Sequence, residues 1–262
     1  MSRTSDLNLS PAPEPASATQ RIWSQSLYEF RLLMRNGEQV LLTLVIPILL
    51  TVGLAKTGVV DLGAAASGYP RIQTVVPGVL ALAVLSSAFT AQAISVGFDR
   101  RYGVLTFIGT TPLGRAGLVA GKTVAIGLIV IGQVLIIGIV GALLGWRPQG
   151  SIVFALALIA LGVAAFSGLA LLMAGTLRAE ATLAGANLVF VLLLFGGGTI
   201  IAPDQYPNGA EQVVQLLPTA ALAQGLRLVL RDGQAPTLQM WLVLAIWAFG
   251  AIAAASRFFR WD

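Results

Sequence analysis

The sequence predicts an all-α, polytopic membrane protein with six transmembrane helices. Of its 262 residues, 56% are apolar and only 10% are charged, and the mean hydropathy is +0.85. About a quarter of the residues of a soluble domain are charged, so this chain lacks the polar surface that would cover a water-facing core. Apolar runs long enough to cross a bilayer recur along it instead.

Six stretches without a charged side chain define the predicted spans. They contain 17 to 30 residues, and about 20 helical residues cross a hydrocarbon core of about 30 Å. The first stretch is the shortest and contains Pro47, which predicts a kink. The spans are predicted at about residues 38–56, 73–98, 122–146, 151–177, 181–202 and 237–257.

Residues 21–36 precede the first span and predict an amphipathic helix at the membrane interface. Apolar residues recur at helical spacing, and arginines fall mostly on the other side. Arginine heads can meet lipid phosphates while aromatic rings reach the acyl boundary. The alternative is an ordinary packed helix of a soluble subdomain. The residues that carry the interfacial prediction are Trp23, Leu27, Phe30, Arg31 and Arg35.

The distribution of basic residues predicts the orientation. Eleven Lys and Arg residues lie in the flanks on one side of the predicted spans and five on the other. Basic residues collect in cytoplasmic loops, which puts both termini in the cytoplasm and explains the net charge of +5 without nucleic acid. Residues 1–20, rich in Ser, Pro and Ala, are predicted to be a disordered cytoplasmic tail without a cleavable signal peptide. The preference for Arg over Lys suggests a GC-rich bacterial source, and hence a plasma (inner) membrane.

The composition excludes several kinds of chemistry. The chain has no His and no Cys, which removes the usual zinc, haem, iron–sulfur and disulfide sites. None of the six charge-free stretches holds an Asp or Glu, which disfavours a buried proton relay. Residues 116–123 fit a relaxed phosphate-loop pattern, but they lead into a membrane span and follow no strand. No catalytic residue and no metal site are expected.

Two further features lie at or near membrane depth. The neutral polar residues Gln92, Gln133 and Asn187 are expected either to hydrogen-bond between helices or to line a substrate path. The charge-free stretch 212–226 is too short to span and contains Pro218. It predicts a re-entrant or interfacial hairpin between spans five and six, buried against protein.

The loop after span two is the most informative segment. A charged cluster at Asp99–Arg101 leads into a short apolar stretch with Leu105, Phe107 and Ile108, and the chain then returns to the membrane. A short helix that presents apolar side chains to the cytosol usually has a protein partner.

This loop resembles that of the permease subunits of ABC-2 type transporters, a family that includes daunorubicin/doxorubicin-type drug exporters. The residues that carry the resemblance are Asp99-Arg100-Arg101-Tyr102-Gly103-Val104-Leu105, Thr111-Pro112, Arg115 and Gly121-Lys122. The chain departs from the family pattern at Arg101, where a second acid is usual, and at Val104, where Thr is usual. The resemblance extends over nearly everything after residue 20, so residues 37–262 are identified as the transmembrane domain.

The resemblance implies that this loop is a coupling helix that docks on an ATP-binding subunit. The implied contact residues are Asp99, Arg100, Arg101, Tyr102, Gly103, Leu105, Phe107, Thr111, Pro112 and Arg115. Two copies of that subunit would hold ATP and Mg, and this chain would bind no cofactor itself. A second permease, identical or paralogous, would complete an exporter of a drug-like or lipid-like amphiphile from the cytoplasm or inner leaflet. A gradient-driven secondary transporter or channel, or a non-transporting assembly subunit, remains the alternative.

Overall fold

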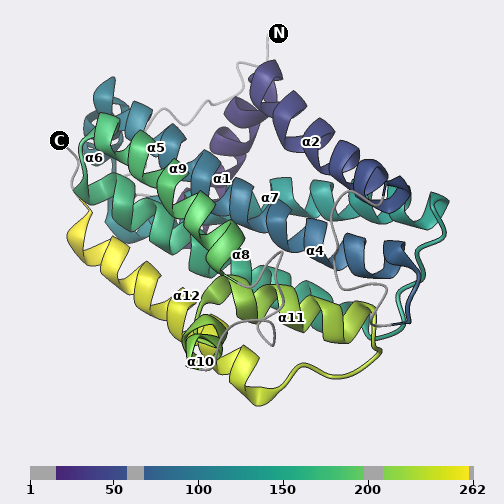
Figure 1. Cartoon of the computed structure of the whole chain (residues 1–262). Helices are drawn as coiled ribbons and strands as arrows, with labels where there is room; N and C mark the ends of the chain where they lie inside the picture. The colour runs from purple at the N-terminus through teal and green to yellow at the C-terminus, as the bar shows by residue number, and fades with distance from the viewer. Residues whose placement is uncertain (1–15, 58–67, 198–208, 260–262) are drawn as a thin grey trace, which may run out of the picture.

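The computed structural model describes residues 16–57, 68–197 and 209–259 (Figure 1). Every regular element in these ranges is a helix, as the sequence predicts. In chain order they are α1 (Ala18–Arg35), α2 (Gly37–Lys56), α4 (Arg71–Leu85), η1 (Ser86–Ala91), α5 (Gln92–Arg101), α6 (Val104–Gly109), α7 (Gly114–Leu143), α8 (Ile152–Thr176), α9 (Ala179–Gly196), α10 (Ala210–Gln215), α11 (Pro218–Leu230) and α12 (Leu238–Phe258). Most of the predicted tail at 1–20 and the end of the span predicted at 181–202 lie outside the described residues.

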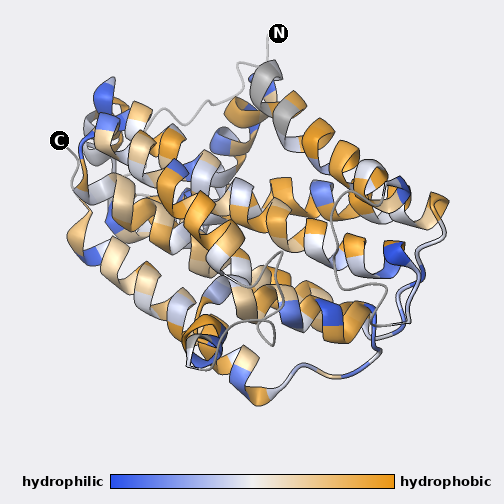
Figure 2. Ribbon diagram, in the orientation of Figure 1, coloured by the Kyte–Doolittle hydropathy of each residue, from blue (hydrophilic) through white to orange (hydrophobic). Residues whose placement is uncertain are grey.

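Five helices of the described chain are long and apolar enough to cross a membrane. They are the continuous rod Arg71–Arg101, made of α4, η1 and α5, and the helices α7, α8, α9 and α12. Each coincides with one of the predicted spans. The remaining predicted span coincides with α2, whose apolar part, Thr43–Lys56, is shorter than the other five. Hydrophobic residues dominate the long helices, and hydrophilic segments gather near α6 and in the connections at the opposite end (Figure 2).

Helix α8 forms the centre of the bundle and packs along α12. The two backbones approach closely at Gly168, where a Cβ atom would lie 2.8 Å from the Ala251 Cβ and from the Ile252 backbone nitrogen. Small residues permit this approach, and close van der Waals packing is the main source of helix association in lipid. The bundle is therefore held by backbone proximity as well as by its large apolar side chains.

The stretch between the last two spans, for which a re-entrant or interfacial hairpin is predicted, contains the two short helices α10 and α11. Helix α11 has 13 residues, too few to span, and ten of them are buried against α4, α8 and α12. Pro218 stands in its first turn, where its missing N–H costs no hydrogen bond. The indole Nε1 of Trp247 on α12 donates to the carbonyl oxygen of Leu216 at 2.9 Å. This bond satisfies an acceptor where the chain turns between α10 and α11.

The continuous helix Arg71–Arg101 contains a π-helical turn, η1, that the sequence does not predict. π-Turns inside α-helices are rare and occur frequently at functional sites. Here the Ser87 hydroxyl of η1 donates to Oε1 of Gln133 on α7 at 3.2 Å, and Nε2 of Gln133 donates to the Thr43 carbonyl at 2.8 Å. These two bonds join α2, η1 and α7 within the apolar interior.

Candidate functional site

The rod that ends at Arg101 is followed by a sharp turn and the short helix α6. Gly103 has a φ of 73°, and glycine adopts this left-handed conformation without the steric cost of a Cβ atom. Beyond α6, Thr110 and Thr111 donate their hydroxyls to carbonyl oxygens of that helix at 2.7 and 2.6 Å. These bonds satisfy acceptors that a helix end leaves free, so the loop has a fixed shape although it is short.

Helix α6 has one buried face and one exposed face. Leu105 and Ile108 are buried in an apolar cluster with side chains from α5, α7, α8 and α12. Burying a side chain of this size stabilises the fold by about 1.5–3 kcal/mol, which anchors the helix to the end of the bundle. Tyr102 and Phe107 point away and are 73% and 74% exposed. The loop thus presents two aromatic rings from a rigid base, next to the exposed residues Thr111, Pro112 and Arg115.

Two arginines connect the end of α5 to the turn between α8 and α9 and to the first turn of α9. Nη1 of Arg100 donates to the Leu177 carbonyl oxygen at 2.8 Å. Arg101 lies 3.5 Å from a carboxylate oxygen of Glu180, with both side chains largely exposed. An exposed pair of this kind contributes little stability, about 0–1 kcal/mol. Both residues therefore have contacts within the chain, and their predicted contacts with a partner stay predictions.

A buried cluster of three charges lies directly behind the loop. Nζ of Lys122 on α7 lies 2.8 Å from Oε1 of Glu29 on α1 and 2.8 Å from Oδ2 of Asp99 on α5. The Lys122 side chain is 4% exposed, and Asp99 is 18% exposed. Nε2 of Gln25 donates to the same Glu29 oxygen at 2.8 Å. The cluster joins three helices at one point.

The charged cluster carries two carboxylates and one ammonium. A buried charge is costly to strip of water unless it is paired and hydrogen-bonded, and here each carboxylate has an oxygen on the same ammonium. Asp99, predicted as a contact for another subunit, thus has its partner inside the chain. Glu29 was not predicted as a functional residue; the signal that could have found it is Lys122, a cation in an apolar helix that requires a counter-ion.

Helix α1 packs along α7 and also contacts the loop that contains α6. A guanidinium nitrogen of Arg21 donates to the carbonyl oxygen of Pro112. Ser26 and Glu29 form the buried side of α1, whereas large apolar residues such as Trp23 face outward. Of the residues predicted for the interfacial helix, Trp23, Arg31 and Arg35 are exposed, and Leu27 and Phe30 are half-buried.

The three neutral polar residues predicted at membrane depth lie in different surroundings. Gln133 bridges α2 and η1 as described above. Gln92 is 3% exposed, and within the described residues its amide nitrogen and oxygen have no hydrogen-bond partner. Asn187 is exposed on α9, where its amide nitrogen donates to the Leu183 carbonyl of its own helix at 3.1 Å. The structure does not bring these three residues together into one site.

The segment with the relaxed phosphate-loop pattern, residues 116–123, is helical throughout and belongs to α7. Its lysine is the buried Lys122 of the charged cluster, held by two carboxylates. A phosphate-binding loop requires free backbone N–H groups at a helix N-terminus, and these residues have none to offer within a continuous helix. Within the described residues there is also no group of three metal-ligating side chains.

Comparisons with known proteins agree with this arrangement. The family model of the ABC-2 type transporter matches residues 20–230, which includes α1, the charged cluster and α6. A transport permease of Bacillus subtilis (strain 168), YvfS, is 26% identical over 234 residues, covering 84% of this chain and 89% of the relative. The match begins in α1 and runs through α11, so it rests on most of the bundle rather than on one motif. The chain is a multi-pass membrane protein that belongs to the ABC-2 type transporter family.

Proposed function

We propose that this chain is the membrane-spanning permease subunit of an ATP-driven exporter, and that α6 is the element on which a separate ATP-binding subunit docks. The observation that carries the proposal is the pair of exposed rings, Phe107 on α6 above the buried Leu105 and Ile108, and Tyr102 at the end of α5, stacked on Phe98. Aromatic side chains on a rigid support are frequent hot spots of protein interfaces. ATP and Mg would lie on two copies of that subunit, and this chain would bind no cofactor.

Movement of α6 would reach the membrane helices through its contacts. Closure of the ATP-binding subunits would push the loop, and the Arg100–Leu177 bond would pass that displacement to the turn between α8 and α9. On the other side, the Lys122 cluster and the Arg21–Pro112 bond would carry it to α1. ATP is the ligand that would favour one arrangement over the other, by binding more tightly to the closed ATP-binding subunits.

A second permease, identical or paralogous, would complete the transport path. Helix α9 is the surface that suits this contact, because only Thr182 and Ala186 of its 18 residues are buried within the chain. Its exposed face carries Asn187, a polar amide that lipid solvates poorly, among apolar residues that include Leu188 and Val191. A facing copy could supply the hydrogen-bond partner that the Asn187 oxygen would need.

The substrate would be a drug-like or lipid-like amphiphile, exported from the cytoplasm or inner leaflet. Each predicted span has a stretch of 17 to 30 residues without a charged side chain. The membrane interior of the protein would therefore offer a substrate mostly neutral and apolar contacts. The basic residues would keep both termini and α6 on the cytoplasmic side of a bacterial plasma membrane.

Purification of the tagged chain from its native membranes, with mass spectrometry of the co-purifying proteins, tests the proposal. We expect a stoichiometric ATP-binding chain, and a second permease sequence if the pair is paralogous. Phe107→Ala should weaken its capture by about 30-fold, the effect of losing about 2 kcal/mol at a hot spot. Phe249→Ala is the matched control, because this ring is 73% exposed on α12, away from the loop.

Two outcomes would contradict the proposal. Equal capture of the ATP-binding chain by both phenylalanine variants would show that α6 is not the docking element. Transport by a chain that purifies alone, abolished by dissipating the proton gradient but not by ATP depletion, would indicate the secondary transporter instead.

A further inference from the structure

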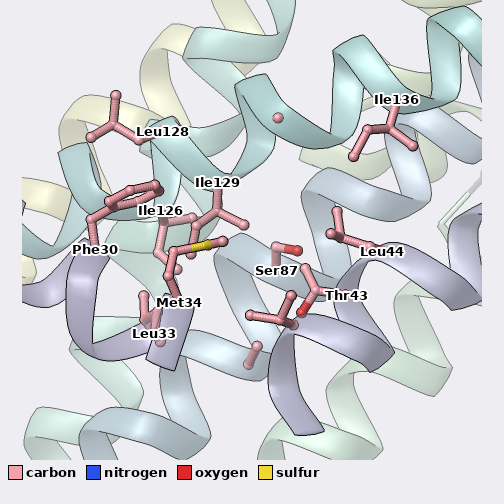
Figure 3. Close-up of a pocket in the computed structure, with 13 residues that line it drawn as sticks. Phe30, Leu33, Met34, Thr43, Leu44, Ser87, Ile126, Leu128, Ile129 and Ile136 are labelled. Carbon is pink, nitrogen blue, oxygen red and sulfur yellow. The ribbon is translucent and has the colours of Figure 1, made fainter. Parts of the chain in front are cut away.

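An apolar cavity of about 180 Å³ lies between α1, α2, η1 and α7. Its walls include Phe30 and Met34 from α1, Leu44 from α2, and Ile126 and Ile129 from α7. Figure 3 shows these side chains converging on one space from the consecutive helices α1 and α2 and from α7, which lies far from them in the sequence. The lining is mostly hydrocarbon, and the space corresponds to several times the roughly 30 Å³ that one water molecule occupies in the liquid.

The polar groups at the cavity already have partners. The Ser87 hydroxyl donates to Gln133, and the Thr43 carbonyl accepts from the Gln133 amide. A water molecule is held in a buried cavity by two to four hydrogen-bonding groups, and apolar cavities without them stay dry and bind apolar ligands. The chemistry of the walls therefore suits a hydrocarbon chain rather than water or a polar molecule.

The position of the cavity along α7 places it in one leaflet. Ile126 and Ile136, the first and last lining residues on α7, lie four and fourteen residues after Lys122, the buried cation at the α6 end of the bundle. At a rise of about 1.5 Å per residue, the wall extends from about 6 to about 21 Å beyond that charge. Half of a hydrocarbon core of about 30 Å covers most of this depth, so the larger part of the cavity faces the acyl chains of the leaflet on the α6 side.

The charges on the adjoining part of α1 favour an anionic headgroup. Arg31 and Arg35 are exposed and follow directly the lining residues Phe30 and Met34. Glu38 is the only acidic residue between positions 30 and 44, so this segment keeps a net positive charge. Arginine on the polar face of an interfacial helix binds lipid phosphates.

We propose that this cavity holds part of one acyl chain of an anionic phospholipid from the adjacent leaflet, with the lipid phosphate at Arg31 and Arg35. The lipid would fill the space where α1 meets α2 and α7. Because Glu29 of the charged cluster is also on α1, occupancy of the cavity would help to set the position of α1 on α7. The proposal does not depend on the proposed transport function.

Photolabelling of the full chain in lipid nanodiscs tests this proposal. The probe is phosphatidylglycerol with a photoreactive group in its acyl chain, and the labelled peptides are identified by mass spectrometry. We expect labelling of residues such as Met34, Leu44 and Ile129. Gly132→Leu should reduce it at least about tenfold, because a Cβ atom at Gly132 has no neighbour within 4 Å and the added side chain would occupy the cavity.

The matched control is Gly138→Leu, which adds the same side chain to α7 where a Cβ atom also has no neighbour within 4 Å, but not in the cavity wall. It should label like the parent chain. Arg31→Gln and Arg35→Gln, at exposed positions that leave the core intact, should each lower labelling by the phosphatidylglycerol probe about fivefold. Labelling by a phosphatidylcholine probe with the same acyl chain should not change in these variants.

Three results would overturn the proposal. The first is equal labelling of the cavity residues in the parent chain and in Gly132→Leu. The second is a loss of labelling in Gly138→Leu as large as in Gly132→Leu, and the third is a phosphatidylcholine probe that labels the cavity as strongly as the phosphatidylglycerol probe. No ATP and no partner chain enter the measurement, so any of these results would leave the proposed docking of α6 untouched.

Discussion

Lys122 faces two carboxylates, and its single charge can neutralise only one of them. The three side chains come from α1, α5 and α7. Glu29 and Asp99 precede Lys122 by 93 and 23 positions in the sequence. The sequence could indicate that Lys122 needs a counter-ion, but not which acids supply it, because such pairing depends on how distant helices pack. The sequence therefore does not single out Glu29, and the contact of Asp99 with another subunit stays a prediction.

Lys122→Met should lower the free energy of unfolding by about 3–5 kcal/mol, because it leaves two buried carboxylates without a counter-ion. The thermal midpoint of the purified protein in detergent measures the loss. Combining Lys122→Met with Glu29→Gln and Asp99→Asn should restore most of it.

The control is Arg101→Gln, which breaks an exposed pair and should change stability by no more than about 1 kcal/mol. A Lys122→Met variant as stable as the parent chain would show that the cluster does not hold the three helices together.

The helix at residues 18–35 could be predicted from the sequence, but which of its faces contacts the rest of the protein could be predicted only in part. Apolar spacing identified the amphipathic stretch, and Trp23 does face outward. The side that is buried is the polar one, with Ser26 and Glu29 against α7. In a membrane protein a lipid-facing side is apolar, so hydrophobicity alone does not tell which face contacts protein.

The close approach of α1 to α7 depends on Gly121. A Cβ atom there would lie 2.9 Å from Cγ and 3.2 Å from Cβ of Gln25 on α1. Gly121→Leu should therefore displace α1 and separate Glu29 from Lys122. A cysteine at Ser26, which is fully buried, reports the change, since the chain has no other cysteine to react with a maleimide.

We expect Ser26→Cys to react slowly alone and at least about tenfold faster with Gly121→Leu. Gly127→Leu is the control, because a Cβ atom at this position of α7 has no neighbour within 4 Å. Equal reactivity of Ser26→Cys alone, with Gly121→Leu and with Gly127→Leu would mean that Gly121 does not determine how closely α1 packs on α7.

The boundaries of the spans show what charge patterning can and cannot reveal. The charge-free stretch predicted a helix from residue 122, but α7 begins at Gly114. Arg115 and Lys122 are within the helix because a helix can continue past the lipid boundary, so the gap marks the apolar part rather than the helix ends. The π-turn η1 leaves no periodic pattern of its own, since it inserts a single wider turn into an apolar run.

For the whole molecule, the all-helical bundle and the family could be predicted, because both rest on long runs and on a local motif. The arrangement of the helices could not: nothing in the sequence indicates that α8 is central or that α9 is almost uncovered. Orientation in the membrane stays a prediction, made from the bias of eleven basic residues over five.

Single cysteines test that orientation, again without background from the native chain. A maleimide that cannot cross the membrane should label Arg147→Cys in intact cells. It should label Phe107→Cys only after the cells are permeabilised, since α6 is expected in the cytoplasm. The reverse pattern would invert the topology and remove α6 from the reach of ATP-binding proteins.

The docking of α6 is tested most directly by cross-linking from its exposed ring. Phe107→Cys carrying a photoreactive maleimide, irradiated in native membranes, should cross-link to an ATP-binding chain that mass spectrometry identifies. The same reagent at Phe249→Cys, equally exposed on α12, should not capture that chain. Cross-links from position 107 that reach only lipid, or the same products from both positions, would show that α6 is not the docking element for an ATP-binding subunit.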